Sequence, residues 1–165
     1  MKKSGLWWLA GAAALLFGGF LPHGTDAAQL LPVTALYVDL TADGTVTLDC
    51  DADVTGSGKS LPAALDDLCL AAPGELFLQT AQQLVFTPAA LKLLPQAVAD
   101  ARLRPAAQVY VLRGEVPDMD AAAEYLQAHP GGVTLAAVRA AELGAGDAPL
   151  PVLLSAEGRL TLHGA

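Results

Sequence analysis

The feature of this sequence that most constrains its fold is the alternation of short apolar runs with helical segments after residue 34. Ala35–Leu40 and Thr45–Cys50 are strand-like runs, and the Asp-Gly pair between them predicts a hairpin. Glu75–Thr80 and Gln108–Leu112 are expected to be buried strands, and Pro151–Ser155 and Leu160–His163 are two further strand-like runs. The last two flank the tight turn at residues 156–159 and predict a second hairpin. Strands that alternate with helices in this way predict an α/β layer structure.

The expected helices each follow a side chain that can cap them. A Ser, Thr or Asp at this position accepts a hydrogen bond from an amide of the first turn. The expected caps and helices are Ser60 before 61–70, Thr87 before 89–103, Asp118 before 119–128 and Thr134 before 135–143. Pro95 lies inside the second of these and predicts a kink there. Val54–Lys59 is expected to be a flexible loop, and Gln82–Phe86 fits either a strand extension or a loop.

The first 27 residues have the organisation of a signal peptide. Lys2 and Lys3 precede an apolar run of about 16 residues, and small side chains at Thr25 and Ala27 suit a signal peptidase. The run is short for a membrane span, which needs roughly 20 residues, although a retained anchor is the alternative reading. We therefore expect cleavage at the Ala27/Ala28 bond and a periplasmic protein, with membrane contact only through an uncleaved signal segment.

The mature part is expected to be a single domain over residues 28–165, in which 28–74 supply the hairpin and first helix. The whole chain carries 17 acidic and nine basic residues, for a net charge of −8. Removal of residues 1–27 takes away two lysines and one aspartate, so the mature chain is still more acidic. Such a charge repels phosphate backbones, which disfavours nucleic-acid binding.

Cys50 and Cys69 are the only cysteines, and export would place them where disulfides persist. Cys50 alternates with the apolar residues of its strand, and Cys69 follows apolar residues at helical spacing, so both are expected to face inward. A helix packed on the strand would bring them together, and we predict a structural Cys50–Cys69 disulfide. The alternative, a redox-active pair, fits less well because Cys69 lies near the end of its helix, where the dipole disfavours a thiolate.

Three motifs that suggest chemistry fail on inspection. Gly56–Ser60 resembles the end of a phosphate-binding loop, but Asp53 stands where that loop needs a glycine. His129 and His163 have no partner at metal-ligand spacing. The alternating acids Asp49, Asp51 and Asp53 lack the glycine and terminal glutamate of a calcium loop. The sequence therefore predicts neither a metal, a cofactor nor a catalytic group.

The order of elements from residue 75 to 163 resembles the thioredoxin fold. Leu76–Leu78, Thr87–Leu91 with Pro95, and Leu150–Leu154 are similar to that family's first strand, its active-site turn with a kinked helix, and its cis-proline segment. Thr87 and Ala90 stand where the family carries its catalytic cysteines, which removes the nucleophile for disulfide exchange. The chain also has a short strand at Leu76–Thr80, a proline at the start of the helix over 88–103, a strand that ends in Leu112-Arg113-Gly114, the segment 132–134, and Leu150-Pro151-Val152 before the last strands. In these features it resembles, among relatives without the catalytic cysteines, the TrbC-like pilus-assembly proteins of conjugative type IV secretion.

This resemblance implies a non-catalytic periplasmic protein that helps to assemble a conjugative pilus or type IV secretion apparatus, with envelope proteins as partners. The fold's usual docking face would place partner contacts at Thr87, Pro88, Leu150 and Pro151, with Arg113 as a further contact. Two alternatives stay open. One is a thiol-disulfide oxidoreductase that uses Cys50 and Cys69, and the other is a small ligand-binding domain.

Overall fold

The computed structural model describes residues 30–164 except 132, 145 and 147. The expected signal peptide and its cleavage bond lie outside the described residues. From Leu31 onward the chain forms one compact unit. None of the helices in the described part of the chain is long and apolar enough to cross a membrane.

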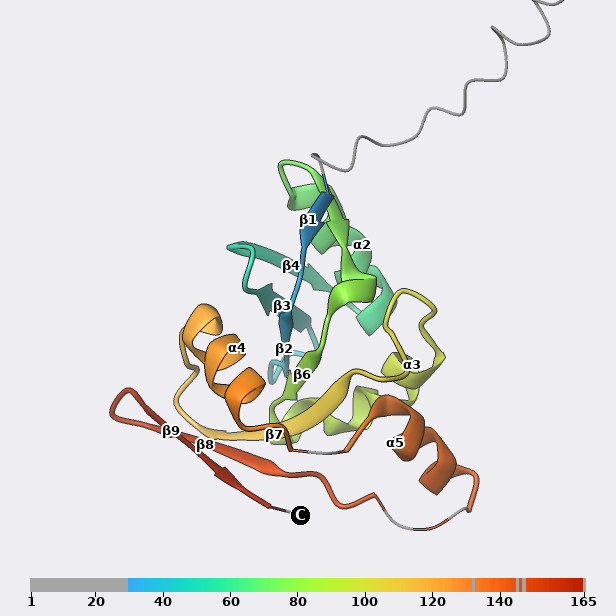
Figure 1. Cartoon of the computed structure of the whole chain (residues 1–165). Helices are drawn as coiled ribbons and strands as arrows, with labels where there is room; N and C mark the ends of the chain where they lie inside the picture. Colours follow the sequence, from blue (N-terminus) through green and yellow to red (C-terminus); the bar gives the residue numbers. More distant parts are fainter. Residues whose placement is uncertain (1–29, 132, 145, 147, 165) are drawn as a thin grey trace, which may run out of the picture. The chain divides into compact units, whose positions relative to one another are not determined.

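Seven strands form a mixed sheet with the spatial order β4-β3-β2-β6-β7-β8-β9 (Figure 1). They are β2 (Ala35–Leu40), β3 (Val46–Cys50), β4 (Val54–Gly58), β6 (Gln83–Phe86), β7 (Gln108–Gly114), β8 (Val152–Ala156) and β9 (Arg159–His163). The four central strands β2, β6, β7 and β8 are parallel, and each outer strand runs antiparallel to its neighbour. A separate two-stranded sheet pairs β1 (Leu30–Pro32) with β5 (Glu75–Phe77).

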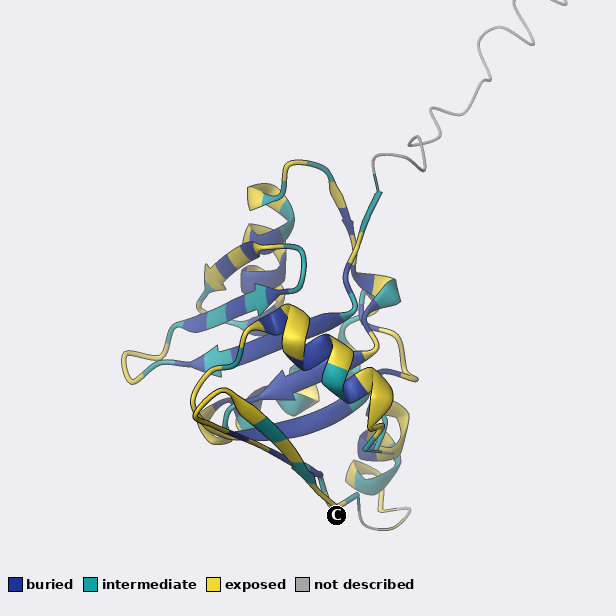
Figure 2. Ribbon diagram, turned by 60° about the vertical axis from the view of Figure 1, so that its left-hand side comes forward, coloured by how far each residue is buried: buried dark blue, intermediate teal, exposed yellow. Residues whose placement is uncertain are grey.

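Helices cover both faces of the sheet because residues alternate between the two faces along each strand. On β6, Leu84 and Phe86 face one core and Val85 faces the other. The larger core contains side chains from α2 (Leu61–Ala71), the 3₁₀ helix η3 (Pro88–Leu93), α3 (Leu94–Ala99) and α5 (Leu135–Glu142). Only α4 (Met119–Ala128) contributes helical side chains to the smaller core, and Figure 2 shows it lying across that face.

Most of the expected elements are confirmed. The first hairpin is β2 and β3, paired in the register Val38–Leu48, and the second is β8 and β9. Ser60, Asp118 and Thr134 cap α2, α4 and α5 by accepting a hydrogen bond from a first-turn amide. The α/β prediction is therefore correct.

The prediction that Glu75–Thr80 is one buried strand was wrong. Only Glu75–Phe77 is extended, and it pairs with β1 outside the seven-stranded sheet, while the 3₁₀ helix η2 (Leu78–Thr80) follows directly. The central strand is instead Gln83–Phe86, all four of whose residues are buried. This segment was ambiguous in sequence because a strand buried on both faces shows no alternation.

Val54–Gly58, expected to be a flexible loop, is the edge strand β4. This segment is ordered because its glycines allow α2 to pack directly against it. A Cβ atom on Gly56 would stand 2.5 Å from the backbone nitrogen of Leu68, and one on Gly58 would stand 2.5 Å from that of Ala64. The glycines therefore let the α2 backbone pack directly on the strand, and their role in the sequence is close packing.

In place of the predicted kinked helix over 89–103, two consecutive short helices span residues 88–99, and residues 100–103 are not helical. Pro88–Leu93 forms the 3₁₀ helix η3, capped by Thr87, and Pro95 lies in the first turn of α3, where its missing amide donor leaves no helical bond unmade. The thioredoxin-like form of the fold that the sequence predicted is not confirmed. No cis peptide bond occurs among the described residues, so Pro151 does not have the expected cis geometry. Neither the expected first strand of the sheet nor the expected proline geometry is present among the described residues.

Candidate functional site

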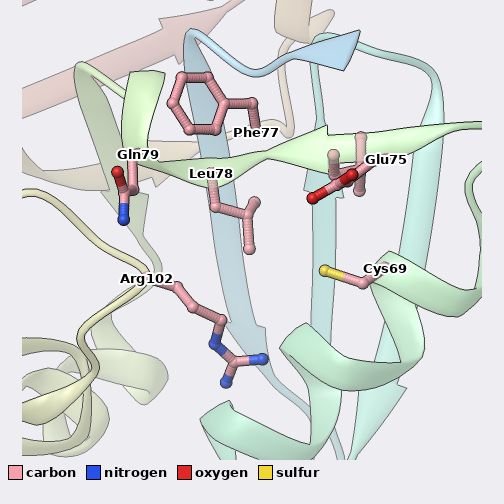
Figure 3. A pocket seen from close by; sticks show the side chains of 7 residues that line it. Cys69, Glu75, Phe77, Leu78, Gln79 and Arg102 are labelled. Atoms are coloured by element: carbon pink, nitrogen blue, oxygen red, sulfur yellow. The ribbon is translucent and has the colours of Figure 1, made fainter. Parts of the chain in front are cut away.

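A groove with a volume of about 410 Å³ lies between the end of α2 and the chain around β5. Its lining comprises Cys69, Glu75, Leu76, Phe77, Leu78, Gln79 and Arg102. Figure 3 shows the Cys69 sulfur and the Leu78 side chain directed into this space, with the Arg102 guanidinium approaching from the opposite side. The groove combines an apolar floor with a carboxylate and a guanidinium at its margins.

Arg102 is held in place by two carboxylates. Its guanidinium lies 2.6 Å from Asp66 of α2 and 2.7 Å from Asp100, and it also donates to the Pro62 carbonyl oxygen at 3.3 Å. The hydrogen bonds from Arg102 lower the pKa of Asp100, and the bond to Asp100 in turn raises the pKa of Arg102. Arg102 is therefore already neutralised and serves to join α2 to the segment before β7.

One large apolar side chain that lines the groove is exposed to solvent. Phe77 is 40% exposed, whereas Leu70, which is 84% exposed and follows Cys69 on α2, does not line the groove. Glu75 forms no salt bridge within the described part of the chain. The groove thus presents apolar surface and an unneutralised negative charge to solvent.

The predicted Cys50–Cys69 disulfide is wrong for this structure, in which both cysteines are free. Cys50 is buried, and its Sγ donates to the carbonyl oxygen of Val54 at 3.4 Å. The face of α2 that packs on the sheet is formed by residues such as Leu65 and Leu68, and Cys69 follows Leu68 by about 100° around the helix. Cys69 therefore lies on the flank of α2 and faces the groove.

The free thiols do not have the environment of redox catalysts. Burial raises the pKa of Cys50, and burial also raises that of Cys69 despite the charge of Arg102. A raised pKa reduces the thiolate fraction that disulfide exchange requires. The geometry thus gives no support to the oxidoreductase alternative.

The residues predicted for partner binding do not form one surface. Thr87 caps η3 and donates from its hydroxyl to Asp39 at 2.7 Å, and Pro88 is exposed beside it. Leu150 and Pro151 precede β8, which is separated from β6 by the whole of β7. Pro151 is buried, and its carbonyl oxygen accepts from Val111. The distance from β6 to β8 is two strand spacings, or roughly 10 Å, so Thr87 and Pro88 do not lie beside Leu150 and Pro151.

Arg113, the remaining predicted contact, is exposed near the carboxyl end of β7 and pairs in register with Leu154 of β8. Leu154 is itself 38% exposed. Neither a hydrogen bond nor a salt bridge ties the Arg113 side chain to another described residue. Its role in partner binding stays a prediction.

The acids near the end of β3 have local structural roles. Both carboxylate oxygens of Asp51 accept from the Thr34 amide at 2.9 Å, and Asp49 accepts from the Cys50 amide. Over the described residues, no group of three or more His, Cys, Asp or Glu side chains is arranged to hold a metal ion.

No protein-family model matches this sequence, no curated protein is detectably similar to it, and no solved structure matches its fold.

Proposed function

We propose that this chain is a non-catalytic interaction protein that binds a short segment of a partner protein in the groove beside Phe77. The observation that carries the proposal is the exposure of Phe77 on the lining of a groove large enough to take an apolar side chain. Aromatic side chains at the margin of a pocket are typical of the residues that dominate binding energy in protein interfaces.

The charges in the groove indicate the chemistry of the partner segment. Asp66 and Asp100 neutralise Arg102, whereas Glu75 has no cationic partner among the described residues. The chain as a whole carries a net charge of −8. The segment that fits best therefore has a large apolar residue close to a lysine or arginine, and the long-range field would speed its approach.

The finer proposal places this interaction in the cell envelope, in the assembly of a conjugative pilus or type IV secretion apparatus. Two sequence arguments support it, namely the signal-peptide organisation of residues 1–27 and the resemblance to TrbC-like proteins with a thioredoxin-like order of elements. The partners would then be exported secretion or pilus components, met in the periplasm.

Selection of displayed peptides against the purified protein tests the groove. We expect the selected peptides to share an apolar residue next to a basic one. Phe77→Ala should weaken their binding by about tenfold or more, the loss expected when an aromatic contact of at least about 1.4 kcal/mol is removed. Glu75→Gln should relax the preference for the basic residue.

Leu143→Ser is the matched control, because Leu143 is 79% exposed at the end of α5 and does not line the groove. Peptides that bind Phe77→Ala as tightly as the wild type would refute the groove proposal.

A photo-crosslinking residue in place of Phe77, in the full chain expressed in its native host, tests the envelope proposal. Adducts with an exported secretion or pilus component are expected. Adducts only with cytoplasmic proteins would refute the envelope assignment and leave the groove itself intact.

A further inference from the structure

A second pocket, with a volume of about 340 Å³, lies on the face of β2, β3 and β4 opposite to α2. It shares no lining residue with the groove described above. Strand pairing groups its polar side chains, because residues in register project from the same face of a sheet. Tyr37 is in register with Asp49 and Asp49 with Thr55, while Thr47 is in register with Ser57. The pocket therefore has a polar floor built from three neighbouring strands.

The Tyr37 hydroxyl is an unsatisfied polar group in this pocket. The residue is 7% exposed, and its hydroxyl forms no hydrogen bond with a described residue. In the described part of the chain, the Gln83 Oε1 is the one side-chain atom that both is sealed from solvent and lacks a partner, so the Tyr37 hydroxyl remains accessible. Burial and the charges of Asp39 and Asp49 raise the pKa of Tyr37 to about 12, which places the hydroxyl near these carboxylates. A group bound in the pocket would supply the hydrogen bond that the fold leaves unmade.

Two carboxylates of the pocket are oriented by backbone amides and each keeps one oxygen without a donor. The Asp49 Oδ1 accepts from the Cys50 amide at 2.9 Å, and the Asp67 Oδ2 accepts from the Ser57 amide at 2.8 Å and from its hydroxyl at 3.4 Å. Neither carboxylate forms a salt bridge with a described residue. Burial raises the pKa of Asp49, so a cation placed beside it would stabilise its charged form.

The remaining polar groups of the pocket are hydroxyls that can accept hydrogen bonds. The side chains of Thr47 and Thr55 have no hydrogen-bond partner in the described structure, and none of the described residues that line the pocket is basic. An ammonium or guanidinium group carries several N–H donors and no acceptor. The pocket offers the complementary set, namely free carboxylate oxygens and hydroxyl oxygens without a competing cation.

We propose that this pocket binds an organic cation through an alkyl ammonium or guanidinium group, which donates to Asp49, Asp67 and the Tyr37 hydroxyl oxygen. This chemistry is shared by free amines and by the lysine or arginine side chains of a partner protein. The volume equals that of about eleven water molecules in the liquid, which is enough for such a group and its alkyl chain. The site is independent of the proposed groove, and each proposal can fail without the other.

Calorimetric titration of the purified protein with four probes tests the chemistry, in about 150 mM salt to screen long-range attraction. Diaminobutane and Nα-acetyl-lysine methylamide carry an ammonium group, tetramethylammonium has the charge without a donor, and butanediol has donors without the charge. We expect diaminobutane or the lysine derivative to bind at millimolar concentration or below, and at least about tenfold more tightly than the other two.

The order of the two ammonium probes separates the sources. Tighter binding of diaminobutane would support a free amine as the ligand, and tighter binding of the lysine derivative would support a side chain of a partner protein. Equal binding of tetramethylammonium or butanediol, or no binding of any probe, would overturn the proposal.

Two variants test the location. Tyr37→Phe should weaken binding of the better ammonium probe about tenfold without lowering Tm, because the hydroxyl has no described partner to lose. Asp49→Asn, which keeps the oxygen that accepts from Cys50, should weaken it by about tenfold or more. Glu142→Gln, the matched control, makes the same change in net charge at an exposed position of α5 and should leave binding unchanged. Binding unaffected by Asp49→Asn, or weakened equally by Glu142→Gln, would overturn the proposal whatever the Tyr37 variant does.

Discussion

The two edge strands of the sheet, β4 and β9, are each protected from pairing with another strand by a helix, but the helix packs more closely on β4 than on β9. At the first edge, the Ser57 amide donates to Asp67 of α2 at 2.8 Å. At the second, the Leu162 amide donates to the hydroxyl of Tyr125 of α4 at 3.1 Å. In each case a helical side chain occupies an edge amide that would otherwise be open to pairing with another strand.

The difference lies in what surrounds these hydrogen bonds. The α2 backbone lies directly against the glycines of β4, and the side chains at its interface with the sheet are fully buried. On β9, the side chains alternate between exposed and half-buried, and Leu160 and Leu162 are only partly buried against α4. The β4 edge should therefore unfold only with the whole domain, whereas the β9 edge can open locally.

The largest effect that would test this comparison comes from truncating one leucine on each side. Leu68→Ala in α2 removes a side chain with no exposed surface and should cost about 2–5 kcal/mol in the free energy of unfolding. Leu162→Ala in β9 removes a half-buried one and should cost about 1 kcal/mol. Urea denaturation measures both values, and equal costs would contradict the comparison.

A smaller loss of stability is expected from adding a single methyl group to β4. Gly56→Ala places a Cβ 2.5 Å from the Leu68 nitrogen and 2.6 Å from the Ala64 carbonyl oxygen, which are backbone atoms that cannot move aside alone. We expect a loss of about 1–3 kcal/mol in the same measurement. Gly164→Ala, after β9, meets nothing within 4 Å and should be neutral. A neutral Gly56→Ala would show that α2 does not pack on β4 as closely as the structure indicates.

The same glycines show where sequence reasoning about the fold succeeds and where it stops. Caps such as Ser60 and turns such as Asp43-Gly44 act within a few residues, so the first hairpin and α2 could be predicted from local pattern. Gly56 and Gly58 depend on a contact with a helix that begins after them, and locally they are indistinguishable from a flexible loop. Their spacing of two residues, which puts both on one face of a strand, was the available signal.

The candidate sites were less accessible to sequence reasoning than the fold. Phe77 was assigned to a buried strand, and only its position in the β1–β5 pair leaves it exposed at a groove. The predicted disulfide is absent from the structure because Cys50 is buried in the sheet, whereas Cys69 lies on the flank of α2 and faces the groove.

The edge hydrogen bonds give the next test, with effects near 1 kcal/mol. Asp67→Ala should speed hydrogen exchange of the Ser57 amide about tenfold, because the amide loses its acceptor. Tyr125→Phe should do the same for the Leu162 amide. Each substitution is the control for the other, and exchange measured by NMR should change only at the edge concerned. Slow exchange retained in both variants would mean that neither side chain protects its edge.

The smallest effect is expected in acid, because the one buried carboxylate in an ion pair among the described residues lies on the α2 side of the molecule. The Asp100 side chain is 7% exposed, and Arg102 joins it to Asp66 of α2. Hydrogen bonds from Arg102 lower the pKa of Asp100 below its unfolded value of about 3.9. The Arg102–Asp100 pair therefore stabilises the fold above that pH, and its contribution is lost as the pH falls through the lowered pKa.

Burial raises the pKa of Asp49 in β3, which affects the pH dependence of stability in the opposite sense. The quantity to measure is therefore the difference in unfolding free energy between the wild type and Arg102→Gln. We expect that difference in unfolding free energy to be largest near neutral pH and to shrink below about pH 4, with faster exchange in β4 and not in β9. A difference that stays constant between pH 7 and pH 3 would show that Arg102 stabilises the α2 side by packing alone.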